Sequence, residues 1–173
     1  MPSQSLKEEG WKSHEPVETH PHGGRVPLAL VGGPRLREFY TVLEYLHLLG
    51  GEIVLDATDD GERGRMGWGG VDVVYSSAES LLEVLVDRYL TGVPDVFRRP
   101  NTLFYTWLEE HLRARQARGI LYFSHVWCDL WKAEETRVRE RCGLPLLAVQ
   151  LDGATERDGH IRSRIAAFIE MLQ

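Results

Sequence analysis

Short apolar runs alternate with longer amphipathic stretches along most of this chain. Alternation of this kind is typical of βα units, in which each strand is followed by a helix that crosses back over a parallel sheet. The runs are almost continuously apolar, which indicates strands that are covered by helices on both faces. We therefore predict a Rossmann-like α/β fold, doubly wound, with a mainly parallel sheet of about four strands and helices on both faces. The predicted strands are residues 26–32, 52–57, 119–124 and 145–152.

Five amphipathic stretches predict the helices, and glycines mark where several of them end. Gly50, Gly119 and Gly143 each fall between a helix and the next strand, where a left-handed cap is expected. The last stretch has one apolar stripe, which is formed by Ile161, Ile165, Phe168, Ile169 and Leu172. Residues 61–70 contain five glycines and no hydrophobic period, so we predict a loop there. The predicted helices are residues 35–49, 78–91, 101–117, 127–142 and 160–172.

The beginning of the chain differs from the rest, because residues 1–25 are polar and lack any hydrophobic period. We predict a mobile N-terminal arm over 1–25 and a single α/β domain over 26–173. The formal net charge is −6 and the basic residues are scattered, so nucleic acid is not an expected partner. No apolar run is long enough to span a membrane, and nothing resembles a secretion signal. Two cysteines cannot form a disulfide framework, so we expect a cytoplasmic protein with free thiols.

Ligands of open α/β sheets bind beyond the carboxyl ends of the strands, so the residues there are the candidates for chemistry. Gly32 and Gly33 follow the first predicted strand and His125 follows the third; we predict that these three line a cofactor site. The segment VGGPRL lacks the spacing of a dinucleotide or Walker motif, so a tight turn that requires two glycines is the plainer interpretation. The acidic residues within 56–60 are most simply turn and cap residues.

Cys128 stands out because it lies just after a predicted strand, in the first turn of the next helix. Backbone N–H groups at a helix N-terminus favour a thiolate, which suits a metal ligand or a nucleophile, but a packed structural cysteine fits the sequence equally well. His125 could pair with Cys128, although two ligands do not complete a zinc or iron site. Cys142 is expected to be buried, on a helical face with Trp127, Trp131 and Val138. His47 is expected at the edge of the core, on a face with Leu36, Tyr40 and Leu43.

Three segments of the chain, taken in order, match the pattern of a known family. They are RVPLALVGGP…EYLHLLGGEIVLD, GILYFSHVWCDLWKAEE…CGLPLLAVQLD and the ending GHIRSRIAAFIEML. From residue 26 onward the chain resembles the C-terminal domain of the 2-hydroxyacyl-CoA dehydratase and benzoyl-CoA reductase family, of the 2-hydroxyglutaryl-CoA dehydratase D-component type. The ending keeps the two arginines of the family pattern, Arg162 and Arg164, but has His160 and Ser163 where the pattern has Gln and Thr.

The resemblance implies an iron–sulfur protein of two related subunits that is reduced by a separate ATP-hydrolysing activator and acts on a CoA thioester. Members use a low-potential electron to release a 2-hydroxyl group or to reduce an aromatic ring. Three cysteines of each full-length member hold the cluster, and Cys128 matches one of these positions. Cys142 matches none of them, and the upstream domain that carries the other two ligands is expected to be missing from this chain.

We therefore predict a short family member that acts as a subunit or accessory domain and shares a [4Fe–4S] cluster with a partner chain through Cys128. The partner would be a larger family subunit or a second copy of this chain, and a CoA thioester is the expected ligand. The alternative is a non-catalytic binding or regulatory domain that kept the fold and lost the cluster. A third interpretation makes Cys128 a redox or acyl-transfer nucleophile that is paired with His125.

Overall fold

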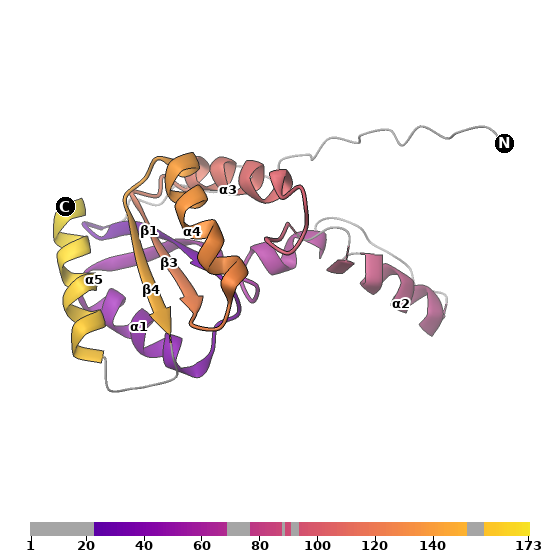
Figure 1. The fold of residues 1–173 in the computed structure, drawn as a ribbon, viewed down its shortest axis with the longest axis horizontal. Coiled ribbons are helices and arrows are strands. Elements are labelled where there is room, and N and C mark those ends of the chain that lie inside the picture. Colours follow the sequence, from indigo (N-terminus) through magenta and orange to yellow (C-terminus); the bar gives the residue numbers. More distant parts are fainter. Residues whose placement is uncertain (1–22, 69–76, 88, 91–93, 152–157) are drawn as a thin grey trace.

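The protein contains one four-stranded sheet in which all strands run parallel (Figure 1). A computed structural model describes residues 23–68, 77–87, 89–90, 94–151 and 158–173. The strand order is β2-β1-β3-β4, so the chain winds outward in both directions from the β1–β3 pair. The doubly wound α/β fold predicted from the sequence is therefore confirmed. The strands are β1 (Val26–Gly32), β2 (Gly51–Ala57), β3 (Gly119–His125) and β4 (Leu146–Leu151).

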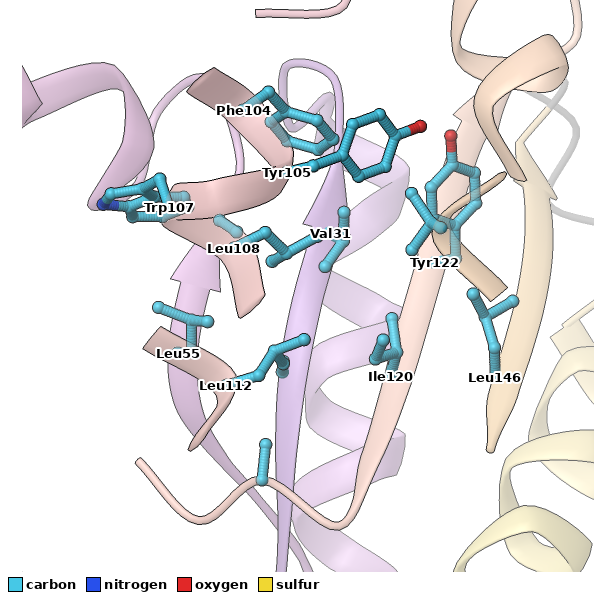
Figure 2. Close-up of a cluster of buried hydrophobic side chains, with 14 of the residues drawn as sticks. Val31, Leu55, Phe104, Tyr105, Trp107, Leu108, Leu112, Ile120, Tyr122 and Leu146 are labelled. Atoms are coloured by element: carbon cyan, nitrogen blue, oxygen red, sulfur yellow. The ribbon is translucent and has the colours of Figure 1, made fainter. Parts of the chain in front are cut away.

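Two hydrophobic layers lie on the two faces of the sheet, as continuously apolar strands require. On one face, α1 (Arg37–Leu48) and α5 (Asp158–Leu172) pack against alternate strand residues such as Leu30 and Phe123. On the other face, α3 (Thr102–Ala114) and α4 (Asp129–Cys142) pack against the intervening residues, such as Val31 and Tyr122. Figure 2 shows this second layer, in which side chains of α3 lie over β1 and β3. The apolar stripe predicted for the last helix does face the core.

Two elements between β2 and α3 do not cover the sheet. Residues 63–68 form a 3-10 helix, η1 (Arg63–Trp68), where the sequence predicted only a loop. The helix α2 (Ala78–Asp87) has no buried residue and stands away from the sheet (Figure 1). The predicted arm, apart from residues 23–25, lies outside the described residues. None of the helices in the described parts of the chain has the length and apolar character needed to cross a bilayer.

The predicted glycine caps are correct at two of three positions. Gly50 follows α1 with φ +94° and Gly143 follows α4 with φ +64°, so both use the left-handed region. The prediction for Gly119 is wrong, because α3 ends earlier and the positive φ of +52° belongs to Gln116. Gly119 instead begins β3, where an added Cβ would lie 2.7 Å from the side chain of Leu172.

Two predicted side-chain environments are also wrong. Trp127 was expected on the buried face of the fourth helix, but α4 begins at Asp129 and this indole is 91% exposed. His47 was expected at the core edge, but it is exposed, because α1 buries the neighbouring stripe of Phe39, Val42 and Leu46. Phe39 fixes this orientation by stacking on Phe123 with ring centroids 4.4 Å apart.

Candidate functional site

The carboxyl ends of β1 and β3 bring together the candidate residues predicted from the sequence. Gly32 ends β1, Gly33 follows it, and His125 ends β3 on the neighbouring strand. The Nε2 atom of His125 lies 2.9 Å from the carbonyl oxygen of Pro34, which joins the turn after β1 to the end of β3. The strand order reverses at this pair of strands, and this is the position where open α/β sheets bind ligands.

The two glycines at the end of β1 allow close packing inside the protein. A Cβ added at Gly32 would lie 2.3 Å from the carbonyl oxygen of Phe123, and one at Gly33 would lie 3.1 Å from Nε1 of Trp131. Gly32 therefore requires glycine even without a ligand, whereas a Cβ at Gly33 would be a tight contact with the Trp131 side chain; both agree with the plainer interpretation of the VGGPRL turn. Their role in cofactor binding stays a prediction.

Cys128 lies at the junction between β3 and α4, in the N-cap position. Its backbone N–H donates to the carbonyl oxygen of His125 at 2.9 Å, and its own carbonyl accepts from the backbone N–H of Lys132 at 3.1 Å. The side chain is half-buried against the cluster beneath α3 and α4 and does not cap the helix. The N-cap position of α4 thus holds Cys128 at the same edge as His125 and Gly33.

Cys142 lies at the other end of α4, about 20 Å away along a helix of this length. It is half-buried against the same core cluster. Burial, assisted by the nearby carboxylate of Glu109, raises the pKa of the Cys142 thiol to about 12. This cysteine is therefore a protonated packing residue, close to the prediction, and it cannot act together with Cys128.

A buried arginine, Arg63, holds the turns at this edge of the sheet together. Its guanidinium donates to the carbonyl oxygens of Gly32 at 3.2 Å, Ala57 at 3.1 Å and Pro94 at 3.1 Å. It also binds the carboxylate of Asp95 at 2.6 Å and pairs with that of Asp59. Burial lowers the pKa of Arg63, and Asp95 opposes this shift. No sequence pattern singles out Arg63, because it lies in a glycine-rich segment without hydrophobic period.

The carboxylates after β2 are already paired by protein groups, as expected for turn residues. Asp56 binds Arg35 at 2.9 Å and accepts a hydrogen bond from the hydroxyl of Thr58 at 2.7 Å. Asp60 accepts from the backbone N–H of Arg35 at 2.7 Å. Two buried donors at this edge have no hydrogen-bond partner among the described residues: Nε of Arg35, which lies 3.8 Å from the carboxylate of Asp60, and Nε1 of Trp131.

Glu134 is a second buried charge that the sequence did not reveal. It is fully buried on α4, accepts a hydrogen bond from the hydroxyl of Tyr105, and pairs with Arg99 at 2.9 Å and Arg137 at 3.2 Å. Burial alone would raise the pKa of Glu134, but the hydrogen bonds from Tyr105 and Arg99 outweigh it and hold the pKa below its ordinary value. Burial raises the pKa of Tyr105, with a further contribution from its hydrogen bond to Glu134. These groups form a structural ion network between α3 and α4.

A comparison with sequence models of protein families identifies the family of this chain. The sequence model of the family described as HGD-D, 2-hydroxyglutaryl-CoA dehydratase, D-component, matches residues 6–172. The chain belongs to this family. No curated protein matches the chain significantly.

The match to the 2-hydroxyglutaryl-CoA dehydratase D-component family spans all residues of the candidate site. The matched range includes the β1 turn, Cys128 and the arginines near the C-terminus. It begins at residue 6, within the predicted arm, so the likeness to the family starts before residue 26. Among the described residues of this family member, no group of three or more His, Cys, Asp and Glu side chains is arranged to hold a metal ion. The described part of the chain therefore holds no complete metal site of its own, and the ligand role of Cys128 stays a prediction.

Proposed function

We propose that this chain is a component of an iron–sulfur acyl-CoA dehydratase or reductase, in which Cys128 supplies one ligand to a [4Fe–4S] cluster shared with a partner chain. The observation that carries the proposal is the position of Cys128, half-buried at the β1–β3 edge in a family member. When bound, such a cluster supplies a low-potential electron. A reducing cytoplasm is the compartment that would keep both thiols free.

The ligand count requires the partner. A [4Fe–4S] cluster is ordinarily held by about four ligands, and one thiolate does not hold it. The surface beside Cys128 suits a protein contact, since Trp127 is 91% exposed and Leu130 is 37% exposed. Tryptophan is enriched in the cores of protein–protein interfaces, so its exposure beside Cys128 supports a contact there. We therefore place the partner, a larger family subunit, over Trp127 and Cys128.

We further propose that a CoA thioester binds at the same edge, next to Gly32, Gly33 and His125. The strand order reverses at this edge, and open α/β sheets bind ligands at such a position. The surrounding carboxylates of Asp56, Asp59, Asp60 and Asp95 outnumber the two guanidinium groups of Arg35 and Arg63. The excess of carboxylates would repel a phosphate anion, whereas a thioester carbonyl carries no net charge and is not repelled in this way. The thioester carbonyl is therefore the group assigned to this edge.

The cluster proposal is tested by iron and acid-labile sulfide analysis, with an absorbance spectrum, on protein prepared without oxygen. The chain has two cysteines, so Cys142→Ser is the matched control for Cys128→Ser. With the partner subunit present, wild type and Cys142→Ser are expected to carry stoichiometric cluster, and Cys128→Ser to lose it. Equal cluster content in all three proteins would refute the ligand role. Absence of a cluster from all three proteins would favour the alternative function, a non-catalytic binding or regulatory domain that kept the fold and lost the cluster.

Thioester binding is tested by calorimetric titration of the purified chain with acetyl-CoA and, separately, with free CoA. His125→Ala is expected to weaken binding of acetyl-CoA at least about tenfold, since the ring joins the two turns of the site. His47→Ala is the control, because His47 is exposed near the amino end of β2 and bonds to Arg25. Equal binding by both variants, or tighter binding of free CoA than of acetyl-CoA, would contradict the assignment.

A further inference from the structure

The sheet has two outer strands, β2 and β4, and each has backbone groups that face away from the sheet. On β4, the carbonyl oxygen of Leu151 accepts from the backbone N–H of Val126 at 3.0 Å, so Leu151 directs its backbone groups toward β3. Because these groups alternate in direction along a strand, those of Leu146, Ala148 and Gln150 face outward. We call this outward row the β4 edge. A row of this kind can pair with a strand of another chain.

Two arginines cover carbonyl oxygens of the β4 edge. Arg139 of α4 donates to the carbonyl oxygen of Leu146 at 3.2 Å, and Arg164 of α5 donates to that of Ala148 at 2.7 Å. The two helices lie on opposite faces of the sheet, so the arginines reach the strand from both sides (Figure 1). Glu135 holds Arg139 in place with a contact of 3.1 Å. The N–H groups of the β4 edge have no acceptor among the described residues.

The other outer strand, β2, is covered more completely. Arg115 donates to the carbonyl oxygen of Val54 at 3.1 Å, and the backbone N–H of Glu62 donates to that of Asp56 at 2.7 Å. The carboxylate of Glu62 accepts in turn from the backbone N–H of Asp56 at 3.4 Å and pairs with Arg115 at 2.7 Å. Arginine side chains therefore occupy carbonyl oxygens on both outer strands, but only β2 also has an outward N–H group that is satisfied.

We propose that the β4 edge is a strand-addition surface for a second copy of this chain, and that Arg139 and Arg164 hold it closed. Two β4 strands related by a two-fold axis pair antiparallel when Ala148 lies opposite Ala148 and Leu146 lies opposite Gln150. This pairing requires the carbonyl oxygens of Leu146 and Ala148 as acceptors, and these are the two that the arginines occupy. Because β2 is covered, such association stops at a dimer. The contact depends neither on a cluster nor on the proposed partner subunit.

The test is sedimentation velocity of the purified, cluster-free chain at concentrations up to about 100 µM, which detects dissociation constants of that order. The variant Arg139→Ala/Arg164→Ala uncovers both carbonyl oxygens and is expected to dimerise at least about tenfold more tightly than wild type. The matched control is Arg141→Ala/Arg162→Ala, because these arginines lie on the same two helices and pack over tyrosine rings. Both variants make the negative net charge larger by the same amount, which by itself opposes self-association. The control is therefore expected to associate no more tightly than wild type.

A third change identifies the strand that pairs. Gln150 has an exposed side chain and an outward N–H, so adding Gln150→Pro to Arg139→Ala/Arg164→Ala removes a donor of the β4 edge without removing a bond to β3. This addition is expected to return association to the wild-type level. Association that does not rise in Arg139→Ala/Arg164→Ala, that rises equally in the control, or that survives Gln150→Pro would overturn the proposal. Should the double variant fail to fold by circular dichroism, Arg164→Ala alone must associate more tightly than wild type, and no increase would overturn it.

Discussion

Replacement of Arg63 by alanine is expected to be among the most destabilising single changes in this protein. The side chain is fully buried and donates to three backbone carbonyl oxygens, those of Gly32, Ala57 and Pro94. Each lost bond to a buried acceptor costs about 1–1.5 kcal/mol, which gives about 3–5 kcal/mol for the three. The paired carboxylates of Asp59 and Asp95 add less, because their side chains are 32% and 21% exposed and regain water.

The assay is urea unfolding, followed by tryptophan fluorescence, of wild type, Arg63→Ala, Arg63→Lys and Arg65→Ala. Lysine keeps the charge but offers fewer donors without the planar fork, so Arg63→Lys should cost about half as much as alanine. Arg65 is exposed on the same 3-10 helix, and its side chain makes a single hydrogen bond among the described residues, to the carbonyl oxygen of Gly61, so Arg65→Ala should stay within about 0.5 kcal/mol of wild type. If Arg63→Ala and Arg65→Ala unfold at the same urea concentration, the reasoning about the buried guanidinium is refuted.

Three further results are expected. The pKa of Glu134 is lower in the folded protein than the unfolded value of about 4.3, so its ionised form stabilises the fold at any pH above that value. This stabilisation is lost as the pH falls through the folded pKa. The free energy of unfolding, measured against pH, should therefore fall less steeply for Glu134→Gln than for wild type. Native Cys142, whose pKa is raised to about 12, should react with iodoacetamide at least about tenfold more slowly than in urea, by peptide mass spectrometry, and equal rates would contradict its burial. Gly32→Ala should cost at least about 1–3 kcal/mol in urea unfolding, because of the carbonyl of Phe123, whereas Gly159→Ala, with nothing within 4 Å, should stabilise the protein by about 0.4–1 kcal/mol.

The strands were predictable from the sequence because each is a short apolar run between turn residues. The predicted range 26–32 equals β1, β2 and β3 are each one residue longer than predicted, and β4 is one residue shorter than its predicted range at each end. Helix ends were less predictable: the helix predicted over 127–142 ends at Cys142 as predicted, but it begins two residues later, at Asp129. Residues 126–128 instead form the connection between β3 and α4.

The candidate site was predictable in position but not in its electrostatics. Placing Gly33, His125 and Cys128 at one edge followed from the rule that parallel strands end together. Nothing in the sequence showed that Arg63 is buried, because its partners Pro94 and Asp95 lie more than 30 residues away. Glu134 was hidden for the same reason, since Tyr105 and Arg99 approach it from another part of the chain.

The sequence by itself determined the alternation of strands and helices, the parallel sheet that they form and the family to which the chain belongs. These follow from local hydrophobic periodicity and from motifs in a fixed order. Only the tertiary structure decided which polar groups are buried and which apolar groups are exposed. Burial depends on residues that are distant in the sequence, and it is burial that paired Arg63 and Glu134 with their partners. For the same reason Trp127 and several apolar side chains of α2 lie at the surface, although their residue types alone would favour burial.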